Sequence, residues 1–101
     1  MNQSHRSSNY FFRKSPSHYH MMLLVMSAHK GSEELSVEEL KTKLFKTSRP
    51  KSAIIITEAV EKGFFKLEKT SHDQRKKFIR PTDSFTKEFD DYIITLKSLV
   101  L

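Results

Sequence analysis

The hydrophobic positions before residue 63 recur at helical spacing in three stretches, and each stretch carries a signal for the start of a helix. Ser15 followed by Pro16 predicts an N-cap and a first helical position, because proline loses no hydrogen bond there. The run Leu35-Ser36-Val37-Glu38-Glu39-Leu40 is a capping box, in which the serine and the second glutamate cap one helix end together. Pro50 marks the first turn of a third helix, which ends near Gly63. The last two helices, joined by a short connection, predict a helix-turn-helix.

Beyond Gly63 the pattern changes from helical to strand spacing. Two groups of strand-forming residues, at 64–67 and 78–79, flank a polar tip, so residues 64–80 are predicted to form a β-hairpin. Thr82 then caps a final helix over residues 83–101. A helix-turn-helix followed directly by a hairpin predicts a winged helix over residues 15–82, in an α+β fold that is mostly helical.

The final helix carries a narrow stripe of large apolar residues. They repeat at spacings of 4, 3, 4 and 3 residues, the pattern of a helix that packs along a seam: Phe85, Phe89, Tyr92, Leu96 and Leu99. The seam either covers the domain's own core or forms a dimer interface, since one short helix does not distinguish the two. We favour a homodimer, because aromatic residues at both ends of the chain leave more apolar surface than a small monomer exposes.

Residues 1–14 are polar and basic, with Tyr10, Phe11 and Phe12 among them. They form either a disordered arm or a first helix that docks through these aromatic side chains. The serine and asparagine content of the first residues favours disorder, so this segment is predicted to be a flexible basic arm.

The charge pattern indicates an acidic partner. The chain of 101 residues has a formal net charge of +6 and a pI near 9.7, and the segment from Lys66 to Arg80 holds six basic and two acidic residues. Nucleic acid is the commonest partner of such a surface, and no basic amphipathic helix indicates a membrane. The apolar run from Met21 to Met26 is too short to span a bilayer. The lack of cysteine excludes a disulfide framework and fits a reducing cytoplasm.

The tip of the predicted hairpin has the chemistry of a DNA-binding wing. The planar guanidinium of Arg75 is favoured in a narrow minor groove, where the negative potential is deepest. Asp73 is placed to brace Arg75 or the hairpin turn. Three lysines are expected to contact phosphates: Lys69, Lys76 and Lys77. The alternative is a hairpin whose lysines are only solvated.

A second basic cluster, between Lys41 and Lys51, covers the turn and the start of the third helix. Recognition helices contact bases chiefly through their first residues, which predicts a recognition helix over about residues 50–62. Two hydroxyl groups of the turn would donate to phosphates, and the start of the helix would reach base edges or adjacent phosphates. The predicted contacts are, in that order, Thr47 and Ser48, then Arg49, Lys51 and Ser52.

The body of this helix leaves two alternatives open. If Ile55, Ile56 and Ala59 face the core, Ile54 and Glu58 lie on the opposite face. The isoleucine could then touch a thymine methyl group, and the glutamate could accept from a cytosine amino group. Otherwise the phase of the helix differs by one residue, and Ile54 belongs to the core.

No arrangement of residues indicates an enzyme. The five histidines never occur at the i, i+4 spacing that holds a metal on a helix. The two glycines cannot build a glycine-rich phosphate loop, and nothing suggests a catalytic triad. We therefore expect no catalysis, no metal site and no cofactor.

From about Ser15 to Leu101, the chain resembles the MarR superfamily of winged-helix transcription regulators, which includes the SarA-type proteins. These proteins typically have a glycine that ends the recognition helix, an Asp-x-Arg pair at the wing tip and a threonine that opens the next helix. The corresponding residues are Gly63, Asp73, Arg75 and Thr82. The capping box at residues 35–40 also lies where the family begins the first helix of its helix-turn-helix.

The resemblance implies a cytoplasmic homodimer that binds double-stranded DNA and acts as a repressor or regulator of transcription. Its recognition helices would enter successive major grooves, and its wings would reach the flanking minor grooves. The alternative, from a different class, is a winged-helix adaptor or anti-regulator that does not bind DNA. Such a protein would contact a protein partner through Ile54 and Glu58.

Overall fold

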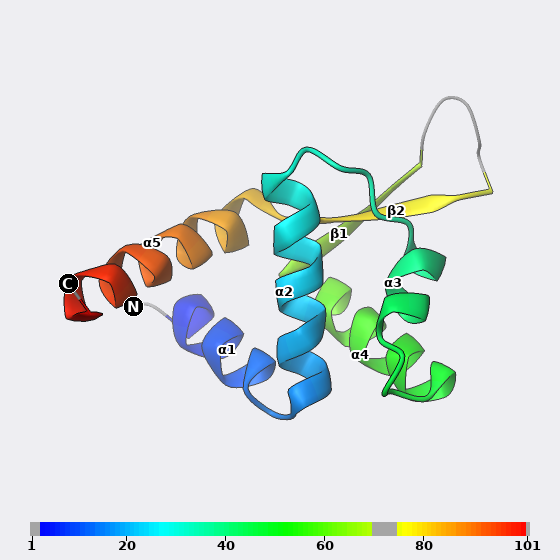
Figure 1. The fold of residues 1–101 in the computed structure, drawn as a ribbon, viewed down its shortest axis with the longest axis horizontal. Helices are drawn as coiled ribbons and strands as arrows, with labels where there is room; N and C mark the ends of the chain where they lie inside the picture. The colour runs from blue at the N-terminus through cyan, green and yellow to red at the C-terminus, as the bar shows by residue number, and fades with distance from the viewer. Residues whose placement is uncertain (1–2, 70–74, 101) are drawn as a thin grey trace.

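The computed structural model of the protein describes residues 3–69 and 75–100, which form five helices and one antiparallel hairpin (Figure 1). In the view of Figure 1, α2 runs through the middle of the molecule, with α1 and α5 on one side and α3 and α4 on the other. The hairpin projects at the end opposite to the termini. The elements are α1 (Gln3–Phe12), α2 (Pro16–Lys30), α3 (Val37–Lys43), α4 (Arg49–Glu61), β1 (Phe65–Lys69), β2 (Lys77–Pro81) and α5 (Asp83–Val100).

The helices of the central part start where the sequence predicts, and the capping serines are in place. The backbone amide of His18 donates to the Ser15 hydroxyl at 3.3 Å, and Pro16 opens α2. At α3 both halves of the capping box form, with the Glu39 amide donating to Ser36 Oγ at 3.0 Å and the Ser36 amide donating to Glu39 Oε1 at 3.1 Å. Ser48 caps α4 in the same way. These local hydrogen bonds satisfy amides that have no partner within the helix.

The hairpin pairs β1 with β2 in antiparallel register, from Phe65 opposite Pro81 to Lys69 opposite Lys77. The chain just before α3 adds a short third segment to this sheet. Ser36 bridges to Phe78, and the Ile79 amide donates to the Leu35 carbonyl at 2.9 Å. The start of the helix-turn-helix is thereby attached to the second strand of the wing, which confirms the winged-helix fold.

An aromatic cluster forms one half of the core and decides the position of α1. Its rings come from α1, from the start of the hairpin and from α5, and neighbouring centroids are 4.9 to 5.9 Å apart: Phe11, Phe12, Phe64, Phe65 and Phe85. Edge-to-face and tilted contacts at this distance add to the stabilisation from burial. The prediction of a flexible arm over residues 1–14 is therefore wrong for the described part of this segment, because the buried pair Phe11 and Phe12 docks a helix onto the core.

The apolar stripe of α5 divides into two parts. Phe85 is only 4% exposed and belongs to the chain's own core, so the prediction that it lies in a dimer interface is wrong. Phe89 packs against the same core, and Tyr92 is half-buried. Leu96 and Leu99 remain exposed on the turns of α5 that extend away from the body (Figure 1).

No helix among the described residues is both long enough and apolar enough to cross a membrane.

Candidate nucleic-acid interface

Helix α4 has one buried face and one face directed to solvent. Ile55, Ile56 and Ala59 are buried in the core, as the first of the two helix phases predicts. Ile54 is 60% exposed, so it does not belong to the core, and Glu58 is half-buried beside it on the helix surface. The outer face of α4 therefore carries an isoleucine and a glutamate.

Ser52 departs from the prediction. It is fully buried, and its hydroxyl has no hydrogen-bond partner among the residues that the structure describes. Ser52 follows the N-cap of α4 by four positions, which turns it to the same side of the helix as Ile55 and Ile56. It cannot reach a base edge or a phosphate from there, and the predicted contact is wrong.

The hydroxyl groups of the turn before α4 already have roles within the fold. Thr47 is half-buried, and its Oγ1 lies 2.6 Å from Ser17 Oγ on α2. The Ser48 hydroxyl accepts from the Lys51 amide at 3.3 Å. Both groups therefore fix the turn that orients the start of α4.

At the start of α4, Arg49 and Lys51 are exposed, and Arg49 forms an ion pair with Glu38 of α3. Its Nη2 lies 2.5 Å from Glu38 Oε1, while Lys41 Nζ lies 3.4 Å from the other oxygen of the same carboxylate. Arg49 is 11 positions away from Glu38, so the helix-turn-helix has to close before the pair can form.

Among the described residues of the wing, four exposed basic side chains lie toward its tip. Lys69, Lys76 and Lys77 are exposed, as is Arg75. Toward the base of the wing, Glu68 binds Arg80 at 2.7 Å and approaches Lys66 at 3.6 Å. Asp73, the predicted brace of Arg75, lies outside the described residues.

A groove of about 380 Å³ lies between α3, α4 and the wing. Its walls bring together residues that are far apart in the sequence. The charged ones are Glu38, Lys41, Glu61, Arg75, Lys76 and Lys77. The groove thus has a net positive lining, with cations on the α3 wall and on the wing wall.

A single junction connects α4, the wing and α5. Gly63 ends α4 with a φ of 81°, a conformation that costs glycine little and other residues more. The Thr82 hydroxyl donates to the carbonyl of Gly63 at 2.8 Å and to that of Phe64 at 3.2 Å. The same oxygen accepts from the Phe85 amide at 3.3 Å and so caps α5, as predicted.

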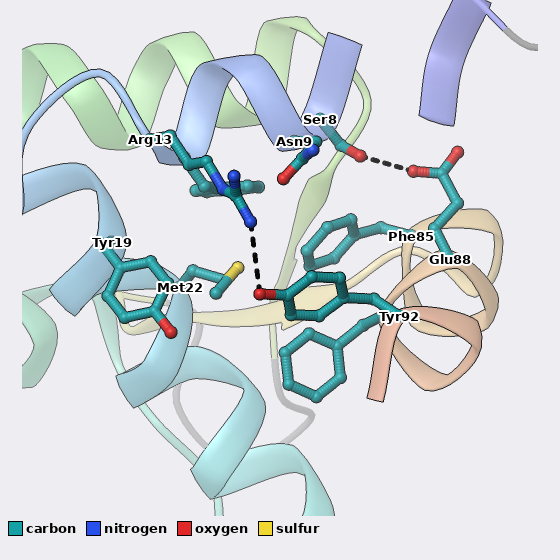
Figure 2. A pocket seen from close by; sticks show the side chains of 10 residues that line it. Ser8, Asn9, Arg13, Tyr19, Met22, Phe85, Glu88 and Tyr92 are labelled. Carbon is teal, nitrogen blue, oxygen red and sulfur yellow. Dashed lines mark hydrogen bonds between the residues drawn. The ribbon is translucent and has the colours of Figure 1, made fainter. Parts of the chain in front are cut away.

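A smaller cavity, of about 50 Å³, lies on the other side of the molecule between α1, α2 and α5 (Figure 2). Figure 2 shows two hydrogen bonds across it. Ser8 Oγ donates to Glu88 Oε2 at 2.6 Å, and Arg13 Nη2 donates to the Tyr92 hydroxyl at 3.3 Å. The two bonds join α1 to α5.

Two ionisable groups near these helix starts have altered pKa values. Burial of the imidazole lowers the pKa of His18, and the positive charges of Lys14 and Lys51 act in the same direction, against an opposing effect of Glu58. The hydrogen bond from the Ser36 backbone lowers the pKa of Glu39, and the Ser36 side chain adds to it. Among the described residues, no three His, Cys, Asp or Glu side chains form a group that could hold a metal ion.

Comparison with known proteins gives matches among solved structures. The sequence matches no family model and no curated protein. The heme-bound sensor protein PefR from Streptococcus agalactiae is 17% identical with a TM-score of 0.63, over 97% of this chain and 69% of that one. The transcriptional regulator Tm0710 from Thermotoga maritima is 12% identical with a TM-score of 0.69, over 96% and 65%. A DNA complex of MepR from S. aureus is 18% identical with a TM-score of 0.61, over 99% and 84%.

These similarities cover nearly the whole chain, at sequence identities that establish a shared fold. The chain therefore has the winged-helix fold that the sequence predicted, and it shares this fold with these three proteins.

Proposed function

We propose that the protein is a sequence-specific, double-stranded DNA-binding regulator of transcription. The observation that carries this proposal is the groove between α3, α4 and the wing, which has lysine or arginine side chains on both of its walls. A DNA backbone that enters the groove would be contacted from two sides, with α4 in the major groove and the wing, residues 64–80, in the neighbouring minor groove. The similarity to a regulator of the same fold in complex with DNA supports this arrangement.

Most of the affinity would come from phosphate contacts. Lys69, Lys76 and Lys77 on the wing and Lys51 on α4 are exposed, and Lys76 and Lys77 line the groove. Each lysine that neutralises a phosphate releases a counterion, so the affinity depends on salt but not on sequence. Arg49 would add a phosphate contact or a base contact at the start of α4, with the turn hydroxyls of Thr47 and Ser48 nearby.

Sequence preference would come from three side chains. Ile54 on the exposed face of α4 fits against a thymine methyl group, and Glu58 can accept a hydrogen bond from a cytosine amino group. Arg75 would enter the minor groove, with Asp73 as its brace.

The active form would be a cytoplasmic homodimer that acts by binding and not by catalysis. The exposed apolar part of α5, around Leu96 and Leu99, together with the half-buried Tyr92, would form the interface. A two-fold axis there would direct the two α4 helices into successive major grooves of a pseudo-palindromic site.

Salt-dependent binding to duplex DNA tests the proposal. For the wild type, the logarithm of the association constant is expected to fall linearly with the logarithm of salt concentration. The double variant Lys76→Gln/Lys77→Gln is expected to lower the steepness of that line by about 2, or about 1 for each lysine. The matched control Lys87→Gln/Lys97→Gln removes two exposed lysines of α5 and should leave the slope unchanged.

Absent or salt-insensitive duplex binding would contradict the proposal and favour protein recognition through Ile54 and Glu58. Selection of bound sequences from a random duplex pool then tests the base contacts. Arg75→Ala is expected to flatten the preference at the flanking positions, whereas Ile54→Ala should alter it at the positions under α4.

A further inference from the structure

Glu38 occupies an unexpected position for an acidic residue of a DNA-binding surface. It lies in the first turn of α3 and lines the groove between α3, α4 and the wing. One carboxylate oxygen is 2.5 Å from Arg49 Nη2, and the other is 3.4 Å from Lys41 Nζ. A single acid therefore binds two of the cations that face the groove or its rim.

In the longer of the two ion pairs, the side chain of Lys41 is only 21% exposed. The pair of Glu38 and Arg49 is open to exchange, because these side chains are 69% and 60% exposed and water and salt reach them from outside. Exposed pairs of this kind contribute little to stability, and a competing anion can replace the carboxylate at low cost. A phosphate has the matching geometry, because guanidinium binds phosphate and carboxylate oxygens in the same way.

We propose that Glu38 limits the affinity of the protein for duplex DNA by holding Arg49 and Lys41 until a DNA phosphate displaces its carboxylate. This inference rests on the proposed DNA-binding function. In the free protein the three side chains have a net charge of +1, and in the complex the two cations contact phosphates while Glu38 takes up a cation from solution. This uptake opposes the counterion release that drives binding.

Replacement of Glu38 by glutamine tests the proposal, because glutamine keeps the size and the hydrogen-bonding capacity of the side chain. We expect Glu38→Gln to raise the association constant for duplex DNA about two- to fivefold at low salt, the range that corresponds to an exposed ion pair. The slope of affinity against salt should become steeper by up to about 0.9, equivalent to one more released counterion.

The matched control is Asp91→Asn, which makes the same change in net charge on the exposed surface of α5. It should leave both the affinity and the slope close to those of the wild type. Thermal unfolding of each variant, and sedimentation of each, would show that fold and oligomeric state are retained. A lower affinity of Glu38→Gln would overturn the proposal, since it would mean that Glu38 positions Arg49 for DNA.

A double-mutant cycle separates the ion pair from general charge repulsion. In the background of Arg49→Gln, the gain from Glu38→Gln should be clearly smaller than in the wild type, because the cation that Glu38 holds most closely is missing. An equal gain in both backgrounds would overturn the proposal and leave only repulsion between Glu38 and DNA.

The same measurements distinguish this inference from the function on which it rests. If the wild type binds duplex DNA with a steep salt dependence but Glu38→Gln behaves like Asp91→Asn, only the role of Glu38 is refuted. If neither the wild type nor Glu38→Gln binds duplex DNA at low salt, the proposed function itself fails.

Discussion

Helix α1 and the last turns of α5 lie at the two ends of the chain and on the same side of the molecule (Figure 1). They differ in the burial of their large apolar side chains. Phe12 of α1 is 2% exposed, whereas Leu99 of α5 is 79% exposed. The first half of α5 resembles α1, because Phe85 is buried among the same aromatic rings. The change occurs within α5, beyond Phe89.

The difference shows which apolar surfaces are covered within the chain and which remain available to a partner. The rings of Phe64, Phe65 and Phe85 form a surface that Phe11 and Phe12 complete. The last turns of α5 extend past this surface, where Ile94 and Val100 are also exposed. Leu96, Leu99 and Val100 lie on one side of α5, and an exposed apolar stripe of this kind is typical of an interface, which supports the proposed dimer.

The largest expected effect is on stability and concerns the buried phenylalanines of α1. Phe12→Ala removes a ring that contacts four other phenylalanines and should lower the free energy of unfolding by about 3 to 5 kcal/mol. Chemical denaturation measures the change. Tyr10→Ala, at an exposed position of the same helix, is the control and should change stability by about 0.5 kcal/mol or less. Equal losses for the two variants would mean that α1 is not docked through Phe12.

The second prediction concerns the exposed leucines in the last turns of α5. Leu96→Asp/Leu99→Asp should raise the dissociation constant of the proposed dimer about 100-fold or more, because each buried leucine contributes about 1.5 to 3 kcal/mol. Sedimentation over a range of concentrations measures the association. Ser98→Asp, on the same exposed turns, adds one charge off the stripe and serves as the control. A wild type that stays monomeric at all concentrations would refute the dimer.

A smaller effect is expected where the two regions meet. Ser8 is buried and donates to the Glu88 carboxylate, so Ser8→Ala should lower the free energy of unfolding by about 1 to 2 kcal/mol, as for a hydrogen bond to a charged group. Asn9→Ala, at the exposed neighbouring position, should change stability much less. If both substitutions are neutral, the bond between α1 and α5 adds nothing to the docking of α1.

The smallest expected effect is a pH dependence near α1. His18 packs against the Phe11 ring at 4.9 Å, and its pKa is lowered from the ordinary value of 6.5 because burial disfavours the charged imidazole. The unfolded chain therefore binds a proton more readily, so stability should fall as the pH drops below about 6.5, until the folded protein is protonated as well. His18→Gln should show a flatter stability profile between neutral and mildly acidic pH. An identical profile would refute the assigned cause.

The parts of the fold that the sequence predicted correctly depend on local signals. Ser15 with Pro16, and Ser36 with Glu39, are each within three or four residues of the groups that they cap. Thr82 also lies at the start of its helix, and the hairpin lies between two groups of strand formers. Such contacts are visible in the sequence because they need no distant partner.

The errors concern contacts between distant residues. The docking of α1 depends on phenylalanines more than 50 positions away, so composition alone favoured an arm. Ser52 lies at the start of the predicted recognition helix and Phe85 lies in the apolar stripe of α5, but both face the core of the chain. Neither pattern shows which side of the helix the rest of the fold covers. The pair of Glu38 and Arg49 forms across the helix-turn-helix, and no local pattern predicts it. The sites of DNA contact remain predictions for the same reason.

The Thr82 junction has a consequence for operator length. The end of α4, the start of the wing and the start of α5 are tied to one hydroxyl group, so the angle between the reading helix and the proposed dimer helix is set at that point. A helix of 18 residues is about 27 Å long. A tilt of α5 by about 10° at Thr82 would therefore move the far end of this helix by roughly 5 Å. In the proposed dimer, a small rotation at the junction would thus change the spacing of the two half-sites.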